Sequence, residues 1–92
     1  MSILNKEDAE KIAKKLKAQK ERQTQAHDLW CIYHGTDLVA SIGIRRGSNR
    51  DAGHGHVPNQ IHETPHNAKR LADCTRTRQD WLGNMADKGK LP

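Results

Sequence analysis

Residues 29–45 read LWCIYHGTDLVASIGIR and contain the clearest strand signals of the chain. Its two runs, 29–34 and 38–45, are rich in β-branched, aromatic and small residues and flank the short turn GTD, a pattern that predicts a β-hairpin. One face of the second run is apolar and consists of Leu38, Ala40, Ile42 and Ile44. Because side chains alternate across a strand, we expect this face in the core and the opposite face mostly in water.

A helix is expected before the hairpin, over residues 6 to about 25. Asn5 fits the N-cap, Glu7 and Asp8 lie in the first turn, and neither Gly nor Pro interrupts the segment. Its apolar stripe consists of Ala9, Ile12, Ala13 and Leu16. Since this stripe ends at Leu16, the second half of the helix has no core face, and we expect it to project from the domain.

Two further elements are expected directly after residue 58. The segment 59–63, centred on Ile61, adds a third strand in this interpretation. Thr64 and Pro65 fit the N-cap and first position of a short helix, whose apolar residues are Ala68, Leu71 and Ala72.

A last helix is expected to begin after Thr77, which forms a capping-box pattern with Asp80. Its buried side consists of Trp81, Leu82 and Met85, and residues 87–92 are expected to be a frayed tail. The whole pattern predicts one small α+β domain over residues 1–92, with an N-terminal basic helix, a small antiparallel sheet and short C-terminal helices. We expect residues 46–58 to form a long basic loop rich in Gly and His.

Composition favours binding over catalysis. The chain has 16 Lys and Arg against 11 Asp and Glu, a net charge of +5, which favours an acidic partner. Leu, Ile and Val make up only about 16% of the residues, so the core is thin and gives little rigid framework for catalysis. No apolar run could cross a membrane, and the two cysteines, Cys31 and Cys74, lack Cys-x-x-Cys spacing. We therefore expect a cytoplasmic protein with free thiols.

Basic residues concentrate in two segments. Residues 6–22 hold seven bases against four acids, and we expect a basic face formed by Lys11, Lys14, Lys15, Lys17 and Lys20. This face is either an ordinary solvated helix surface or an arm that lies on phosphates or on an acidic subunit. Residues 45–78 hold seven bases against three acids.

The second basic segment is the predicted binding site. Arginine can fork onto phosphate, glycine lets a ligand approach the backbone, and short polar side chains add donors. The candidate contact residues are Arg45, Arg46, Ser48, Asn49, Arg50, His54, His56, Arg76 and Arg78. The alternative is a solvated loop. With no Phe and only three other aromatic residues, the chain has no platform for stacking bases, which favours contacts to backbone and shape.

Metal and catalytic interpretations are weaker. His54, His56, His62 and Cys74 could bind zinc, but their spacing matches no compact zinc module, and we expect no metal and no cofactor. The string HVPN at 56–59, with His66 downstream, partly resembles the His–Asn–His nuclease motif. The order helix, three strands, helix resembles the messenger-RNA-cleaving toxins of the HicA type, but Asn49 stands where their histidine follows a Gly-Ser pair. We expect no enzymatic activity.

The whole-chain profile resembles the phage-encoded anti-CRISPR proteins, specifically the small inhibitors of the type I-F surveillance complex. The resemblance lies in the Lys-rich opening helix at 6–22, the hairpin at 29–45, the segment IRRGSNRDAGHGHVP at 44–58 and the closing WLG at 81–83. It implies a monomer in the cytoplasm of the bacterial host that docks on the protein backbone and guide RNA of the complex and prevents target DNA from pairing. The alternative is a free-standing basic RNA- or DNA-binding module.

Overall fold

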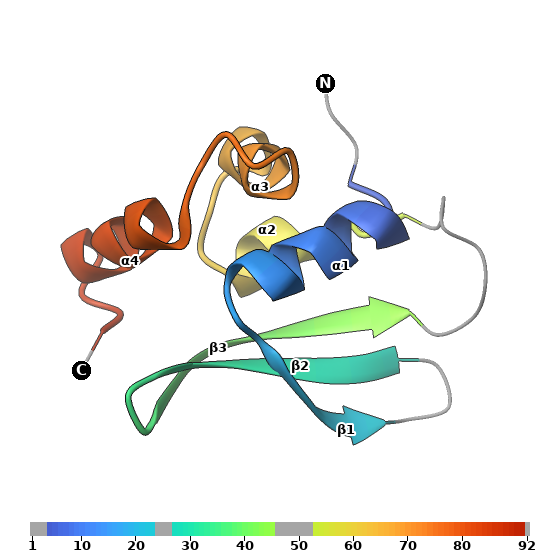
Figure 1. The fold of residues 1–92 in the computed structure, drawn as a ribbon, viewed down its shortest axis with the longest axis horizontal. Helices are drawn as coiled ribbons and strands as arrows, with labels where there is room; N and C mark the ends of the chain where they lie inside the picture. The colour runs from blue at the N-terminus through green and yellow to red at the C-terminus, as the bar shows by residue number, and fades with distance from the viewer. Residues whose placement is uncertain (1–3, 24–26, 46–52, 92) are drawn as a thin grey trace.

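The protein folds as an α+β domain in which helices cover one face of a three-stranded antiparallel sheet (Figure 1). The computed structural model describes residues 4–23, 27–45 and 53–91. The elements in chain order are α1 (Lys6–Lys15), β1 (Gln19–Gln23), β2 (His27–His34), β3 (Asp37–Arg45), α2 (Val57–Gln60), α3 (Pro65–Ala72) and α4 (Arg78–Asp87). The strand order is β1-β2-β3, so β1 and β3 form the two edges.

The hairpin prediction is confirmed. β2 pairs with β3 from His27 opposite Arg45 to His34 opposite Asp37, with one irregularity near Tyr33. The inner face of the sheet consists of Ile32, Ala40, Ile42 and Ile44, all buried. Leu38, which the strict alternation places on this face, is instead 57% exposed, because the pairing register shifts beyond Ile32.

The first helix is shorter than predicted and does not project. The capping box between Asn5 and Asp8 starts α1, and the helix ends at Lys15. Lys17 adopts a left-handed conformation (φ 58°), and the Ala18 N–H donates to Ala13 O at 2.8 Å, which is a Schellman-type ending. The polar residues that follow have no core face as a helix, and they bond through their backbone to β2 as the edge strand β1.

The third strand is therefore β1, and the prediction of a strand at 59–63 is wrong. Residues 57–60 form the short helix α2, with Pro58 in its first turn. Proline lacks the N–H that a strand would donate and has a φ suited to the start of a helix. Ile61 is fully buried as expected, but it lies at the C-cap of α2.

The two C-terminal helices begin as predicted. The Thr64 hydroxyl accepts from the Asn67 N–H before α3, and Thr77 and Asp80 form the capping box of α4. The chain beyond α4 is held in place up to residue 91: the Lys90 N–H donates to Met85 O at 2.8 Å, and the side chain of residue 91 packs on the core. Asp87, the first residue of the predicted tail, ends α4, and the fraying predicted for residues 87–92 stays a prediction.

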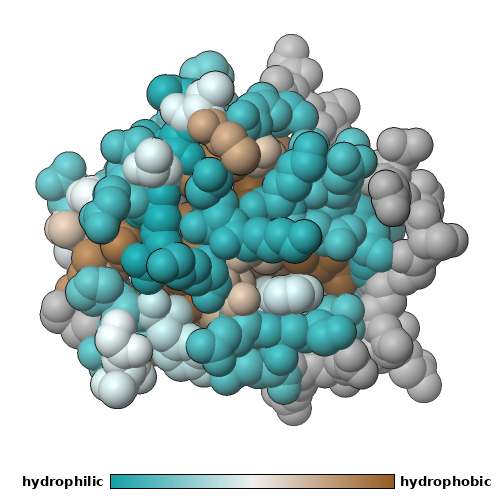
Figure 2. Space-filling view, in the orientation of Figure 1, coloured by the Kyte–Doolittle hydropathy of each residue, from teal (hydrophilic) through white to brown (hydrophobic). Residues whose placement is uncertain are grey.

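The core is a single cluster between the sheet and the helices. It joins Ile12 and Leu16 of α1 to the inner face of the sheet and to the fully buried Leu71, Trp81 and Met85. The Trp81 indole N–H donates to Ile61 O at 2.9 Å, so the largest core side chain also has its polar atom paired. Hydrophilic side chains cover most of the face in Figure 2, and hydrophobic surface is visible only in the gaps between them.

Candidate functional site

The edge of β3 is bound by side chains from α2 and from the segment that leads into it. The Arg45 N–H donates to His54 Nε2 at 3.0 Å, and the Gly43 N–H donates to Gln60 Oε1 at 3.1 Å. His56 Nε2–H donates to Gly43 O at 2.6 Å. These bonds satisfy backbone groups that an edge strand would otherwise present to another chain.

This arrangement gives two of the predicted contact histidines, His54 and His56, bonds within the fold. His54 is fully buried and its Nε2 is occupied by a backbone donor, so it is unavailable to a ligand in this conformation. His56 is partly buried, and its ring lies 5.3 Å from that of His54 and 6.4 Å from that of His27. Both histidines hold the fold together at this edge.

The same contacts fix both ends of the predicted binding loop. Arg45 ends β3, and Gly53 forms an isolated bridge with Asn5, followed by a His54 N–H donation to Leu4 O at 2.9 Å. The predicted contacts Arg46, Ser48, Asn49 and Arg50 lie outside the described residues. Arg45 itself is exposed and remains a candidate contact.

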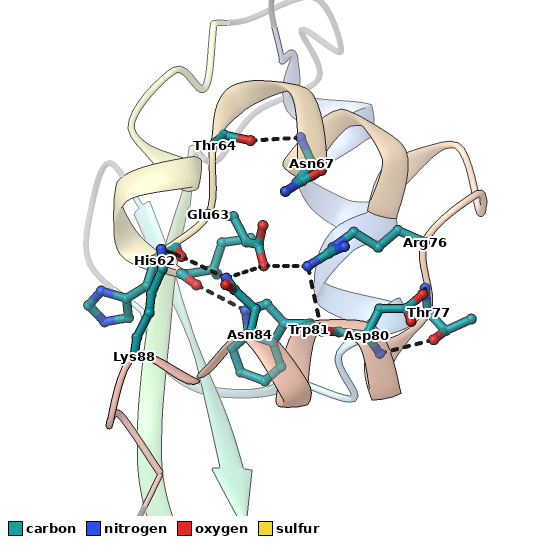
Figure 3. A network of polar contacts seen from close by, with 11 residues as sticks. His62, Glu63, Thr64, Asn67, Arg76, Thr77, Asp80, Trp81, Asn84 and Lys88 are labelled. Atoms are coloured by element: carbon teal, nitrogen blue, oxygen red, sulfur yellow. Dashed lines mark hydrogen bonds and ion pairs between the residues drawn. The ribbon is translucent and has the colours of Figure 1, made fainter. Parts of the chain in front are cut away.

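Arg76 belongs to a buried polar network (Figure 3). The Arg76 guanidinium bonds Glu63 Oε1 at 3.1 Å, and Asn84 Nδ2 donates to the same oxygen at 2.7 Å. The Glu63 side chain is 0% exposed and that of Arg76 is 15% exposed. Lys88 and Asn84 donate to His62 O nearby, which links α4 to the segment before α3. The network gives Arg76 a structural role, and its contact with a partner stays a prediction.

Arg78 is also engaged within the fold. Its Nε donates to Leu16 O at 3.4 Å, and its Nη2 donates to Tyr33 O at 3.3 Å. One side chain at the start of α4 therefore joins the C-terminal end of α1 to the end of β2. A cation beside helix C-terminal carbonyls is favourable.

The five lysines of the predicted basic helix face are divided between α1, the turn after it and β1, and their binding role stays a prediction. Four are exposed and Lys15 is half-buried, the set being Lys11, Lys14, Lys15, Lys17 and Lys20. Lys11 pairs with Glu7 at 3.4 Å, whereas the other four have no ion pair with any described residue.

Two shallow hollows flank Lys11 and Lys14. One, of about 210 Å³, is lined by these lysines together with Glu7 and Glu10, so its charges are mixed. The other, of about 290 Å³, lies where α1 meets the turn after α3, and its described lining consists of Lys11, Lys14, Lys15 and Cys74. The second hollow has a cationic lining among the described residues.

An ion pair that sequence reasoning missed joins α1 to α3. Lys69 Nζ of α3 donates to both carboxylate oxygens of Asp8 in α1, at 3.0 and 3.1 Å, and lies 3.9 Å from Asp73. The hydrogen bond to Asp8 raises the pKa of Lys69. No short-range spacing signals a pair that is 61 residues apart in the sequence.

A second polar cluster binds the edge strand β1 to β2. The Tyr33 hydroxyl donates to Glu21 Oε2 at 2.6 Å, and this bond raises the pKa of Tyr33 to about 12. Burial, with a further contribution from Glu21, raises the pKa of the Cys31 thiol to about 11. The hydrogen bonds from Cys31 and Tyr33 lower the pKa of Glu21. The thiol and phenol are therefore held protonated, which makes them poor nucleophiles.

Free thiols are confirmed for Cys31, which is buried, and Cys74, which is exposed. Within residues 4–23, 27–45 and 53–91, no group of three or more His, Cys, Asp or Glu side chains is arranged to hold a metal ion. In the same ranges, no helix has the length and apolar character needed to span a membrane.

Comparison with known proteins gives no relative: no family model, no curated protein and no solved structure matches the chain.

Proposed function

We propose that the protein is a non-enzymatic inhibitor that docks on a type I-F CRISPR surveillance complex and prevents target DNA from pairing with the guide RNA. The proposal is carried by exposed lysines of α1, of β1 and of the turn between them: Lys14, Lys17 and Lys20 have no acidic partner among the described residues. Such a complex holds guide RNA in a groove that accepts DNA, and a surface with unpaired cations can bind the phosphates of that RNA and so occupy the groove.

A second contact involves Arg45 and the residues that follow it. Arg45 is exposed at the end of β3, while its backbone N–H is bound by the buried His54. An arginine on a fixed backbone loses less conformational entropy when it binds phosphate. We assign Arg46 and Arg50 to the same contact on the basis of the sequence.

Support for a role without catalysis comes from the contacts of two described histidines, His54 and His56. His54 Nε2 accepts from the Arg45 backbone, and His56 Nε2 donates to the Gly43 carbonyl. A general base needs a nitrogen that can reach the proton of a substrate, and these two nitrogens already have partners within the fold.

The test is co-elution with the purified surveillance complex, followed by a target-DNA binding assay. We expect the wild-type protein to co-elute and to block DNA binding, and the double variant Lys17→Glu, Lys20→Glu to lose both properties. The control Arg70→Glu, Lys90→Glu makes the same change in net charge on α3 and the C-terminal segment, and it should retain them. A wild-type protein that does not bind the complex would refute the proposal.

One observation favours a second candidate, a HicA-like RNA-cleaving toxin. The observed order of one helix, three consecutive antiparallel strands and further helices is the order on which that resemblance rests. His66, exposed in the first turn of α3, is a histidine whose side chain has no partner among the described residues. Cleavage of RNA by the wild-type protein and its loss in His66→Ala would select this candidate over the inhibitor.

A further inference from the structure

We infer that the hollow lined by Lys11, Lys14, Lys15 and Cys74 binds a phosphate group. The identity of the ligand rests on the proposed function, under which the phosphate belongs to an RNA backbone. Positions 11, 14 and 15 are spaced i, i+3 and i+4 on α1, so their side chains leave the helix on one side. Cys74, from the turn after α3, completes the described lining of this hollow of about 290 Å³.

The charges around the hollow favour an anion. Lys14 and Lys15 have no carboxylate partner in the described ranges, and Lys11 shares its charge with Glu7 at 3.4 Å. The acid next to Cys74 in the sequence, Asp73, has Lys69 at 3.9 Å. Like charges three and four residues apart on a helix repel one another, and a bound phosphate would remove that repulsion.

The other hollow beside Lys11 and Lys14 can be compared with this one, because the two share these lysines. It also contains Lys11 and Lys14, but Glu7 and Glu10 complete its described lining. Carboxylates repel a phosphate, so this hollow of mixed charge is less favourable to an anion than the one beside Cys74. The arrangement favours the side of Cys74 as the anion site.

The shape of the phosphate hollow is fixed by contacts that do not use its cations. Lys69 of α3 bonds both oxygens of Asp8 in α1, so the two helices that border the hollow are joined by a largely buried pair. Cys74 is held after α3 with φ 64°, and its N–H donates to Leu71 O at 3.3 Å. The lysines are therefore not required for the fold that presents them.

Cys74 gives a direct readout, because Cys31 is buried and Cys74 is exposed. The experiment follows alkylation of native protein by neutral N-ethylmaleimide, with the modified residue identified by mass spectrometry. One arm contains a short single-stranded RNA, another inorganic phosphate, and the reference arm contains chloride at the same ionic strength. We expect RNA to slow alkylation of Cys74 several-fold relative to chloride.

The variant Lys14→Gln, Lys15→Gln should lose this protection and remain folded. The matched control Lys88→Gln, Lys90→Gln removes the same charge from the end of α4 and the segment after it, outside the described lining of the hollow, and should keep the protection. If two phosphate contacts are lost, the salt dependence of RNA binding, as log K against log salt, should become shallower by about 1.4.

The outcomes separate this inference from the proposed function. Protection by RNA but not by inorganic phosphate assigns the site to a nucleic-acid backbone, and protection by both assigns it to a free phosphate group as well. Two results would refute phosphate binding in the hollow: RNA binds without protecting Cys74, or it protects Cys74 equally in the Lys14→Gln, Lys15→Gln variant. Neither result would affect the proposed docking through Lys17 and Lys20. If RNA protects Cys74 but the protein does not bind the surveillance complex, the phosphate site is supported and the proposed inhibitor function is refuted. No protection by either probe overturns the hollow outright.

Discussion

Replacing Arg76 by alanine should destabilise the protein severely, although the sequence places this residue among the partner contacts. Glu63 has no exposed side-chain surface, and Arg76 provides its only described cation, at 3.1 Å. Without the guanidinium, the Glu63 carboxylate keeps a single hydrogen bond, from Asn84 at 2.7 Å. An uncompensated buried charge of this kind costs about 3–5 kcal/mol.

That loss is large for a chain of this size. A domain of 92 residues has a free energy of unfolding of about 5–14 kcal/mol, and the thin core favours the lower part of that range. At roughly 4 °C or more per kcal/mol, the Arg76→Ala variant should melt at least about 12 °C below the wild type. Urea denaturation followed by circular dichroism gives the free energy directly.

A second substitution tests the cause. Glu63→Gln in the Arg76→Ala background removes the buried charge and keeps an acceptor for Asn84, so it should recover a large part of the lost stability. The explanation would be refuted if Arg76→Ala unfolded within about 1 kcal/mol of the wild type, the range of an exposed ion pair. It would equally be refuted if the double variant were no more stable than the single one.

Three further predictions concern β1, the thiols and the β3 edge. Tyr33 is the sole tyrosine, so ultraviolet titration should give a midpoint near its pKa of about 12, and Glu21→Gln should move the midpoint down towards 10. Because the folded protein holds this phenol protonated, its contribution to stability is complete below pH 10 and is lost as the pH rises to about 12. Ellman's reagent should modify Cys74 rapidly in the native protein, while Cys31, with its pKa raised to about 11, should react only after denaturant is added; fast modification of both would contradict the observed burial. His54→Ala should lower the free energy of unfolding by about 1–3 kcal/mol, measured in urea, because a backbone N–H at the β3 edge loses its acceptor.

The elements that the sequence predicted correctly are those with local signals. The hairpin has alternating apolar residues around a glycine turn, and the starts of α1, α3 and α4 have capping residues within four positions. β1 could not be predicted in this way. Its residues, QKERQ, are good helix formers, and only pairing with β2 makes them a strand.

The candidate site was harder to predict because contacts between residues far apart in the sequence decide which of its side chains stay exposed and which bond within the fold. His54 and Arg45 are nine positions apart, and the bond between them exists only once β3 has a free edge beside the segment before α2. Arg78 bonds a carbonyl 62 positions away. From composition alone such residues are expected to be free to bind a ligand, whereas in the structure they bond to other parts of the fold.

The distribution of these contacts changes where a polyanion should bind. Lys69 and Arg76 neutralise the largely buried carboxylates of Asp8 and Glu63, and Arg78 bonds backbone carbonyls, so the C-terminal half has fewer available cations than its net charge suggests. The exposed lysines of α1, of β1 and of the turn between them have no comparable partners in the described chain. Salt screens exposed charges far more than buried pairs. The affinity of electrostatic docking at this surface should therefore fall steeply with salt concentration, whereas the stability that the buried ion pairs give to the fold should change little. Salt concentration thus distinguishes the two groups of basic residues.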